Sequence, residues 1–188
     1  MAQSKKQPTL KNEGVRWQVF PKNQTASDHQ VALIGVFISV YEQIGTPLNR
    51  LQSNEVLGVL RSGLMGLGYE IEGPGEKIAR PVLYGEMGKK EKSYNVDGWH
   101  QGTGTILEVE AGQAVENNRF ALDILKACSI QGAKNLTMAI PSSYHPDRLR
   151  KEGKPPKREF ESVVNTLDSL YISNRFHMPL ESILVVGY

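Results

Sequence analysis

The apolar residues of the chain recur first at helical spacing. Residues 29–44 are apolar almost all round, which is typical of a buried helix. Residues 54–67 carry apolar side chains at every third or fourth position, and Ser53 or Asn54 is available to cap the start of this segment. Two helices are therefore expected before residue 68.

From about residue 79 on, apolar and polar residues alternate, which is the two-residue period of a β-strand. Residues 79–87, 92–97 and 105–111 are expected to be three strands joined by short turns, which predicts an antiparallel meander. The remaining expected elements are a helix at 113–130, a strand at 136–140, a polar loop at 141–156, a helix at 160–172 and a buried strand at 183–186. This order predicts an α/β fold with a mixed central sheet flanked by helices.

Length and composition narrow the class of protein. The chain has 188 residues, of which 39% are hydrophobic, as expected for one globular domain. Its single cysteine, Cys128, excludes a disulfide framework and a cysteine-rich zinc site, and favours a reducing, cytoplasmic location. No run of 18 apolar residues exists to span a membrane.

The charge is small overall but unevenly distributed. The formal net charge is +2, yet residues 1–22 form a basic polar stretch that is expected to be an N-terminal tail, with residues 23–188 as a single domain. Residues 145–159 hold six Lys or Arg side chains against three acids. Such clusters suit a polyanion, although a solvated tail and a solvated loop would have the same composition.

Three carboxylates stand out in the strand region. Glu108 and Glu110 are two residues apart on one expected strand, so they share a face, and the turn before them can bring Asp97 opposite. Close carboxylates repel one another, and a hard divalent cation such as Mg²⁺ or Mn²⁺ relieves that repulsion. The alternative is that both glutamates face solvent on a half-exposed strand.

The spacing of these acids resembles the motif of the PD-(D/E)XK nuclease superfamily. Asp97 is followed after ten residues by Glu108-Val109-Glu110, on a strand hairpin that leads directly into a helix. The sequence departs from the motif at two positions, with Val96 in place of Pro and Glu110 in place of Lys. Some type II restriction endonucleases of the superfamily carry Glu at the second of these positions.

This resemblance implies a fold and a function. The fold would be restriction endonuclease-like, with three layers α/β/α and a mixed central sheet whose strand meander carries the site. The activity would be Mg²⁺-dependent hydrolysis of double-stranded DNA, of restriction or repair type, by a homodimer. Asp97, Glu108 and Glu110 would bind the metal, and Glu110 would bind it or orient the attacking water.

Further residues are candidates for the same site. Glu55, on the helix before the strands, matches the acid that the family often adds, although it would also suit the first turn of a helix. Gln113 and Arg119 begin the helix after the motif and are candidates for contacts with phosphate. The loop side chains expected to contact phosphates are Arg148, Arg150, Lys151 and Lys154.

The missing lysine leaves a second hypothesis open. A chain with this fold but without a complete catalytic motif would be a non-catalytic nucleic-acid-binding or protein-interaction module. Magnesium binding at the three carboxylates distinguishes the two hypotheses, because the module would not need it.

Overall fold

A mixed six-stranded sheet forms the centre of the fold in the computed structural model, which describes residues 14–112, 114–115, 118–173 and 175–188. Its strands, in spatial order, are β1 (Arg16–Phe20), β8 (Ser182–Gly187), β7 (Asn135–Ile140), β6 (Thr105–Val109), β5 (Gly98–His100) and β2 (Glu70–Ile71). The central pairs β8–β7 and β7–β6 are parallel, and the outer pairs are antiparallel. The expected α/β class with a mixed sheet is confirmed.

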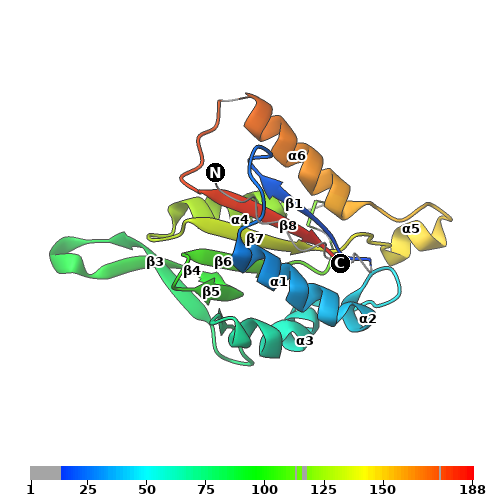
Figure 1. Ribbon diagram of the computed structural model, residues 1–188, viewed down its shortest axis with the longest axis horizontal. Helices are drawn as coiled ribbons and strands as arrows, with labels where there is room; N and C mark the ends of the chain where they lie inside the picture. The colour runs from blue at the N-terminus through cyan, green and yellow to red at the C-terminus, as the bar shows by residue number, and fades with distance from the viewer. Residues whose placement is uncertain (1–13, 113, 116–117, 174) are drawn as a thin grey trace, which may run out of the picture.

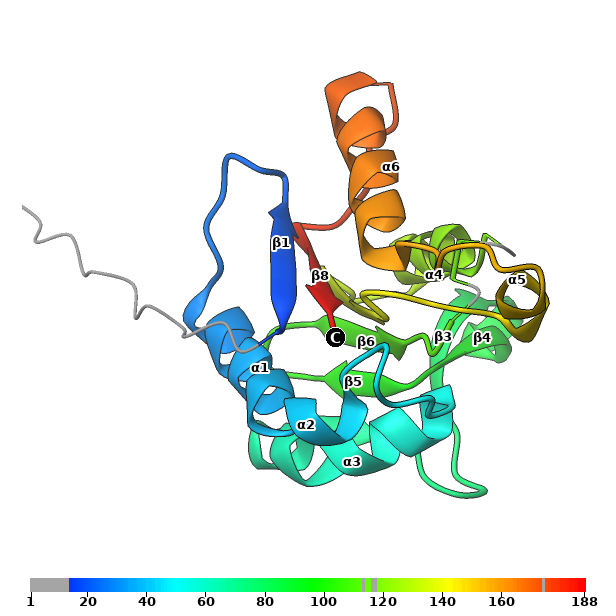
Figure 2. The same cartoon turned by 90° about the vertical axis from the view of Figure 1, so that its right-hand side faces the viewer.

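Helices cover both faces of this sheet (Figures 1 and 2). On one face lie α1 (Asp28–Ser39), α2 (Tyr41–Ile44) and α3 (Ser53–Gly66), and on the other lie α4 (Arg119–Ser129) and α6 (Glu159–Ser173). Two hydrophobic clusters fill the two interfaces, and the three-layer arrangement follows from them.

Alternation along β6 assigns its side chains to these two interfaces. Leu107 and Val109 belong to the core beneath α1 and α3, whereas Ile106 belongs to the core beneath α4 and α6. Glu108 therefore points toward the α4 side of the sheet. The neighbouring strand β8 is buried along its whole length, as its continuous apolar run predicted.

The expected N-terminal tail is too long. Residues Arg16–Phe20 form the edge strand β1, which pairs antiparallel with β8. Val15, Val19 and Phe20 are almost completely buried, so this part of the basic stretch belongs to the domain. The strand was missed because its exposed Arg16 made the segment resemble the polar residues before it. Residues 1–13 lie outside the described residues.

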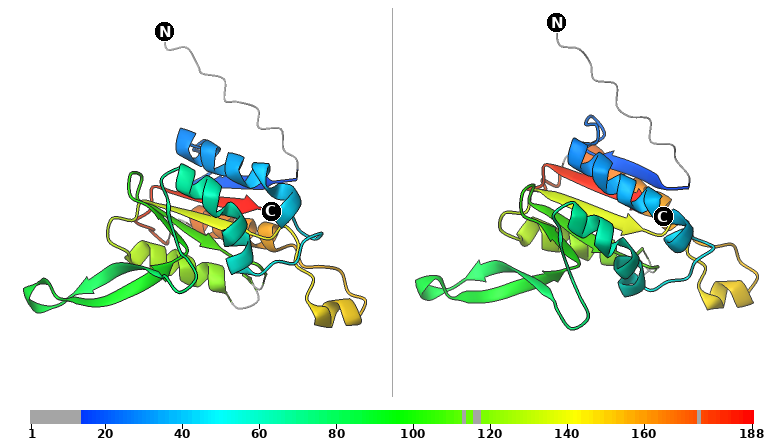
Figure 3. Two further views of the ribbon diagram at one scale, coloured as in Figure 1. Left: turned by 90° about the horizontal axis from the view of Figure 1, so that it is seen from below. Right: turned by 60° about the horizontal axis from the view of Figure 1, so that its bottom comes forward.

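The expected three-strand meander is also wrong. β3 (Ile78–Tyr84) and β4 (Lys90–Val96) pair only with each other, as a ribbon that projects from the sheet, while β5 and β6 form a separate hairpin inside the sheet (Figure 3). The turn of the ribbon contains a short 3₁₀ helix, Glu86–Gly88. We call residues 78–96 the β3–β4 arm. The pattern of alternating side chains did not distinguish the two sheets, because both have period two.

Other boundaries shifted by a few residues. The first expected helix is divided at Val40 into α1 and α2, and α4 begins only at Arg119. The expected loop 141–156 contains a helical turn, α5 (Asp147–Lys151), and its ends are joined by a bridge between Tyr144 and Lys157. Within the described ranges, no helix is both long enough and apolar enough to cross a membrane.

Candidate active site

A row of acidic side chains crosses the sheet at the junction between β5 and β6. The pairing of Gly98 with Leu107 places the preceding residue, Asp97, opposite Glu108. On the other side, the backbone N–H of Glu72 donates to the carbonyl of Asp97 at 2.9 Å. Because cross-strand partners share a face, Glu72, Asp97 and Glu108 lie side by side beneath α4.

The third expected acid, Glu110, continues the same face beyond the end of β6. Its backbone N–H donates to the carbonyl of Ala139, which keeps the chain in the sheet register past Val109. One carboxylate oxygen of Asp97, Oδ2, accepts the backbone N–H of Val109 at 2.7 Å. The structure thus brings Asp97, Glu108 and Glu110 together on one surface.

Helix α4 adds an acid and a base to this surface. Asp123 is 5% exposed, and Lys126 donates to it from one helical turn away, with 2.6 Å between Nζ and Oδ1. Both residues lie on a helix face that is otherwise apolar, among Phe120, Ile124 and Ala127. Lys126 supplies positive charge to a cluster that lacks a lysine at position 110.

Two further basic side chains reach the cluster from its sides. Lys77, at the root of the β3–β4 arm, forms an ion pair with Glu72. Arg119 Nη1 lies 3.9 Å from Glu110 Oε2, a distance that allows attraction but no hydrogen bond. Five acids and three bases therefore line one cleft of about 340 Å³, with an excess of two negative charges when all are ionised.

Burial raises the pKa of each of the three acids of the motif. The pKa of Asp97 rises to about 6, although the N–H of Val109 opposes the shift. The pKa of Glu108 rises to about 9, first through burial and then through the charge of Asp123. The pKa of Glu110 rises to about 7 for the same two reasons, against the pull of Arg119. The surrounding protein therefore disfavours three simultaneous negative charges here.

Two buried carboxylate oxygens without hydrogen-bond partners indicate how a metal ion would fit this cluster. Glu108 Oε1 and Glu110 Oε2 are buried and accept no hydrogen bond, which is a costly state for a carboxylate. A hard cation bound by oxygen ligands would satisfy both atoms and offset the excess negative charge. Among the described residues, no three His, Cys, Asp or Glu side chains already converge as a metal-binding group. A cation would therefore have to be bound with rotation of these side chains.

The acidic cleft continues into a larger and more basic hollow. Ser53 and Arg119 line both the cleft of the carboxylates and a neighbouring hollow of about 770 Å³. The walls of the second hollow include Arg50 and His145, the latter from the segment before α5. An extended anionic ligand could lie across both.

Glu55 does not lie in this cleft, contrary to the expectation. Helix α3 begins earlier than expected, with Gln52 as its N-cap, so that Glu55 becomes the third residue of the first turn. Its Oε2 accepts the backbone N–H of Gln52 at 2.7 Å, and the side chain is exposed. The carboxylate thus serves the helix start, and Glu72 provides the additional acid of the cleft.

The residues expected to contact phosphate lie in different places. Arg119 lines both hollows, as a phosphate-contacting residue would require. Gln113 lies outside the described residues. The four loop cations are exposed on α5 or just after it, where Arg150 pairs with Asp147 and Lys154 Nζ lies 2.8 Å from Glu152.

Glu72, Asp123 and Lys126 were missed, although the sequence contains a signal for each. Glu70 and Glu72 alternate with Ile71 as Glu108 and Glu110 do with Val109. Asp123 and Lys126 interrupt the apolar stripe of an amphipathic helix, where charged side chains are unusual unless paired. Polar residues within an apolar stripe were thus the available indication.

Comparison with known proteins gives a distant likeness in fold to solved structures. No protein-family model matches the chain, and a search of curated proteins finds no match. The chain is similar to the restriction endonuclease BglII, as seen in its crystal structure with a DNA 16-mer, with a TM-score of 0.48 and 14% sequence identity. The alignment covers 92% of this chain and 75% of BglII. A likeness at this distance assigns no activity, so the function has to be argued from the site itself.

Proposed function

We propose that this protein is a Mg²⁺-dependent endonuclease that hydrolyses double-stranded DNA, of restriction or repair type. Asp97, Glu108 and Glu110 hold the ion, which Mn²⁺ can replace. Each chain carries one such site, so cutting both strands calls for a two-fold homodimer. The resemblance of Asp97 and Glu108-Val109-Glu110 to the motif of PD-(D/E)XK nucleases supports this function.

One observation carries the proposal. One buried carboxylate oxygen of Glu108 and one of Glu110 lack a hydrogen-bond partner, in a cleft that has more acids than bases. Buried carboxylates without partners lower the stability of the fold unless a ligand compensates them. Their presence therefore favours a bound cation. Carboxylate oxygens select Mg²⁺ or Mn²⁺ over zinc.

The residues around the ion have separate tasks. A bound Mg²⁺ would supply positive charge at the phosphate and lower the pKa of a water molecule. Glu110 lines the cleft beside Arg119, where it can bind the ion or accept a proton from the attacking water. Lys126, held by Asp123, contributes the positive charge that stabilises the negative charge developing on the phosphate.

A plasmid-cleavage assay tests the proposal. Supercoiled plasmid is incubated with the protein in Mg²⁺, in Mn²⁺ and in EDTA, and nicked and linear products are separated on a gel. We expect products with either metal and none in EDTA. Intact plasmid in every condition, at protein concentrations where DNA binding is measured, would refute nuclease activity.

The alternative is a non-catalytic nucleic-acid-binding or protein-interaction module. The ion pair between Lys126 and Asp123 favours it, because an internal cation already compensates part of the acidic charge. Isothermal titration with Mg²⁺ separates the two functions, since the module should release no heat that depends on Glu108. A Glu108→Gln variant provides the matched control.

Lys126 is expected to matter for the rate of cleavage more than for DNA binding. Lys126→Met removes a charge that acts on the transition state, and comparable losses of a single stabilising group cost about 10²-fold in rate. Lys126→Arg should retain part of the activity, because it keeps the charge. Single-turnover rates under saturating protein measure both variants, and Lys134→Met serves as control on another ion pair. Equal rates for Lys126→Met and the parent would remove Lys126 from the mechanism.

The cations around α5 are expected to contact DNA phosphates. Replacing Arg148, Arg150, Lys151 and Lys154 with Ala should weaken binding to all sequences alike. The slope of log K against log salt should fall by roughly 0.9 for each phosphate that the variant no longer neutralises. Arg150 and Lys154 already pair with acids of the same segment, so the other two side chains should contribute most. Fluorescence anisotropy at several salt concentrations gives the slope, and an unchanged slope would make the segment a solvated connection.

A further inference from the structure

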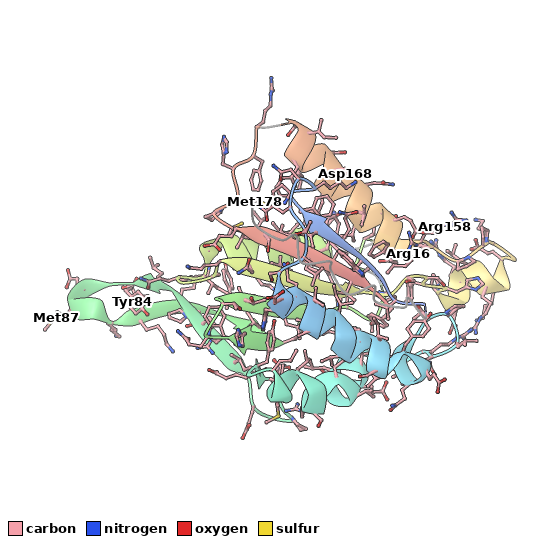
Figure 4. The ribbon with its side chains drawn as sticks, viewed as in Figure 1. Arg16, Tyr84, Met87, Arg158, Asp168 and Met178 are labelled. Atoms are coloured by element: carbon pink, nitrogen blue, oxygen red, sulfur yellow. The ribbon has the colours of Figure 1, made fainter. Side chains whose placement is uncertain are left out.

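The β3–β4 arm exposes apolar side chains at a distance from the rest of the protein. Figure 4 shows Met87 at its outer end and Tyr84 close by. Met87 is fully exposed, and Leu83 and Tyr84 are about half exposed, at 51% and 49%. A two-stranded ribbon by itself is marginally stable in water, so an arm with an apolar end gains stability from a partner.

The conformation of the turn makes Met87 unusual. Its φ is 57°, in the left-handed region that Gly or Asn adopts at much lower cost. A large apolar side chain is thus present at a position where neither solvent exposure nor backbone geometry favours it. A contact made by the side chain itself would account for its presence.

Charge indicates the chemistry of the partner. Lys90 and Lys92 are exposed and lie on the same face of β4, because side chains alternate along a strand. Glu91 points to the opposite face and packs back against the turn, where the carboxylate would collide with any side chain at position 85. Lys89 adds a third exposed cation before the strand. One face of the outer arm therefore presents positive charge next to apolar groups, which suits a polyanion such as the phosphate backbone of a nucleic acid and not a basic or neutral surface.

The dimensions of the arm fit a DNA groove. A two-stranded ribbon enters the major groove, which is about 12 Å wide. Asp97 follows Met87 by ten positions, and at about 3.3 Å per residue this stretch of chain spans at most roughly 30 Å, close to one turn of duplex. Asp97 directly follows β4, and Lys77 at the root of β3 lines the acidic cleft. The arm is thus anchored at the site and reaches about one helical turn away.

We propose that the β3–β4 arm binds double-stranded DNA in a groove, about one helical turn from the bond that is cut. Lys89, Lys90 and Lys92 contact phosphates, and Met87 with Tyr84 packs against the walls of the groove. This inference rests on the proposed function for its ligand, but it concerns binding and does not require cleavage.

The test compares two triple variants in the Glu108→Gln background, so that the DNA stays intact. One variant replaces Lys89, Lys90 and Lys92 with Ala, and the matched control replaces Lys22, Lys134 and Arg175, which lie outside the arm. Circular dichroism and thermal melting verify that both fold. Anisotropy with a duplex of fixed sequence, repeated at several salt concentrations, gives affinity and salt slope, and hydroxyl-radical footprinting gives the protected length.

We expect the arm variant to lose roughly two to three units of salt slope, about 0.9 per phosphate, while the control keeps the parent slope. Its footprint should shorten by about one turn at each end, because each protomer of the proposed two-fold dimer carries one arm. Equal slopes and footprints for parent and arm variant, with the parent bound to DNA, would overturn the arm inference alone. A parent that binds DNA without ever cutting it would refute the nuclease function and leave the arm inference standing. Loss of a dimer by the arm variant in sedimentation, with DNA binding unchanged, would make the arm a protein contact and overturn the inference.

Discussion

Glu108→Gln is expected to abolish DNA cleavage while the fold is kept or stabilised. The substitution keeps the size of the side chain and removes a carboxyl whose ionised form the site disfavours, as its pKa of about 9 indicates. It also removes a ligand of the proposed ion, and a loss of 10³-fold in rate corresponds to about 4 kcal/mol of transition-state stabilisation. DNA binding near neutral pH in the absence of metal should be unchanged, because the raised pKa of Glu108, about 9, already keeps its carboxyl protonated there.

Single-turnover cleavage, anisotropy and thermal melting together measure this result. Glu42→Gln, an exposed residue of α2, is the matched control and should behave as the parent. Asp97→Asn is a second test at the opposite strand, chosen in place of Ala because an amide oxygen can still accept the N–H of Val109. Full cleavage by both site variants would contradict the assignment of the active site.

Stability in EDTA is expected to fall as the pH rises from about 5 to about 9. The folded pKa values of Asp97, Glu110 and Glu108, about 6, 7 and 9, all lie above their ordinary values. Between the ordinary and the raised values, the folded protein binds protons that the unfolded chain releases. The free energy of unfolding therefore decreases with pH over this window.

Magnesium should oppose this loss. It binds the deprotonated carboxylates of the folded state, so its stabilisation grows as the pH rises. Melting curves across the pH range, with EDTA or with Mg²⁺, give the two profiles, and each kcal/mol corresponds to roughly 2–4 °C in a domain of this size. The double variant Glu108→Gln/Glu110→Gln should flatten the EDTA profile and remove the response to Mg²⁺. Parallel profiles with and without Mg²⁺ would mean that the cluster binds no cation.

Local patterns sufficed for much of the fold. The apolar periodicity of 29–44, 54–67 and 160–172 predicted α1 with α2, α3 and α6 to within a few residues, because a helix that buries one face must repeat its apolar residues. The continuous apolar run at 183–186 predicted the buried strand β8. These features depend on neighbours along the chain, and a single sequence contains them.

Part of the candidate site was also accessible from the sequence. Glu108 and Glu110 share a face by strand geometry alone, and the length of the turn limited how far Asp97 could lie from them. The structure brings the three side chains together as this reasoning expected. Metal binding by these three side chains stays a prediction, which the titration and melting experiments test.

Only the tertiary structure decided which other side chains join them. The pairing of β2 with β5 brings Glu72 to the cleft, and the packing of α4 against β7, the neighbour of β6, brings Asp123 and Lys126 there. Glu55 is excluded because the first turn of α3 uses its carboxylate. The tertiary structure also decided the strand pairing. β1 belongs to the central sheet because it pairs with β8, which is far away in the sequence, whereas β3 and β4 pair with each other outside that sheet. Such pairings depend on the burial available in the complete fold, and local periodicity contains no information about it.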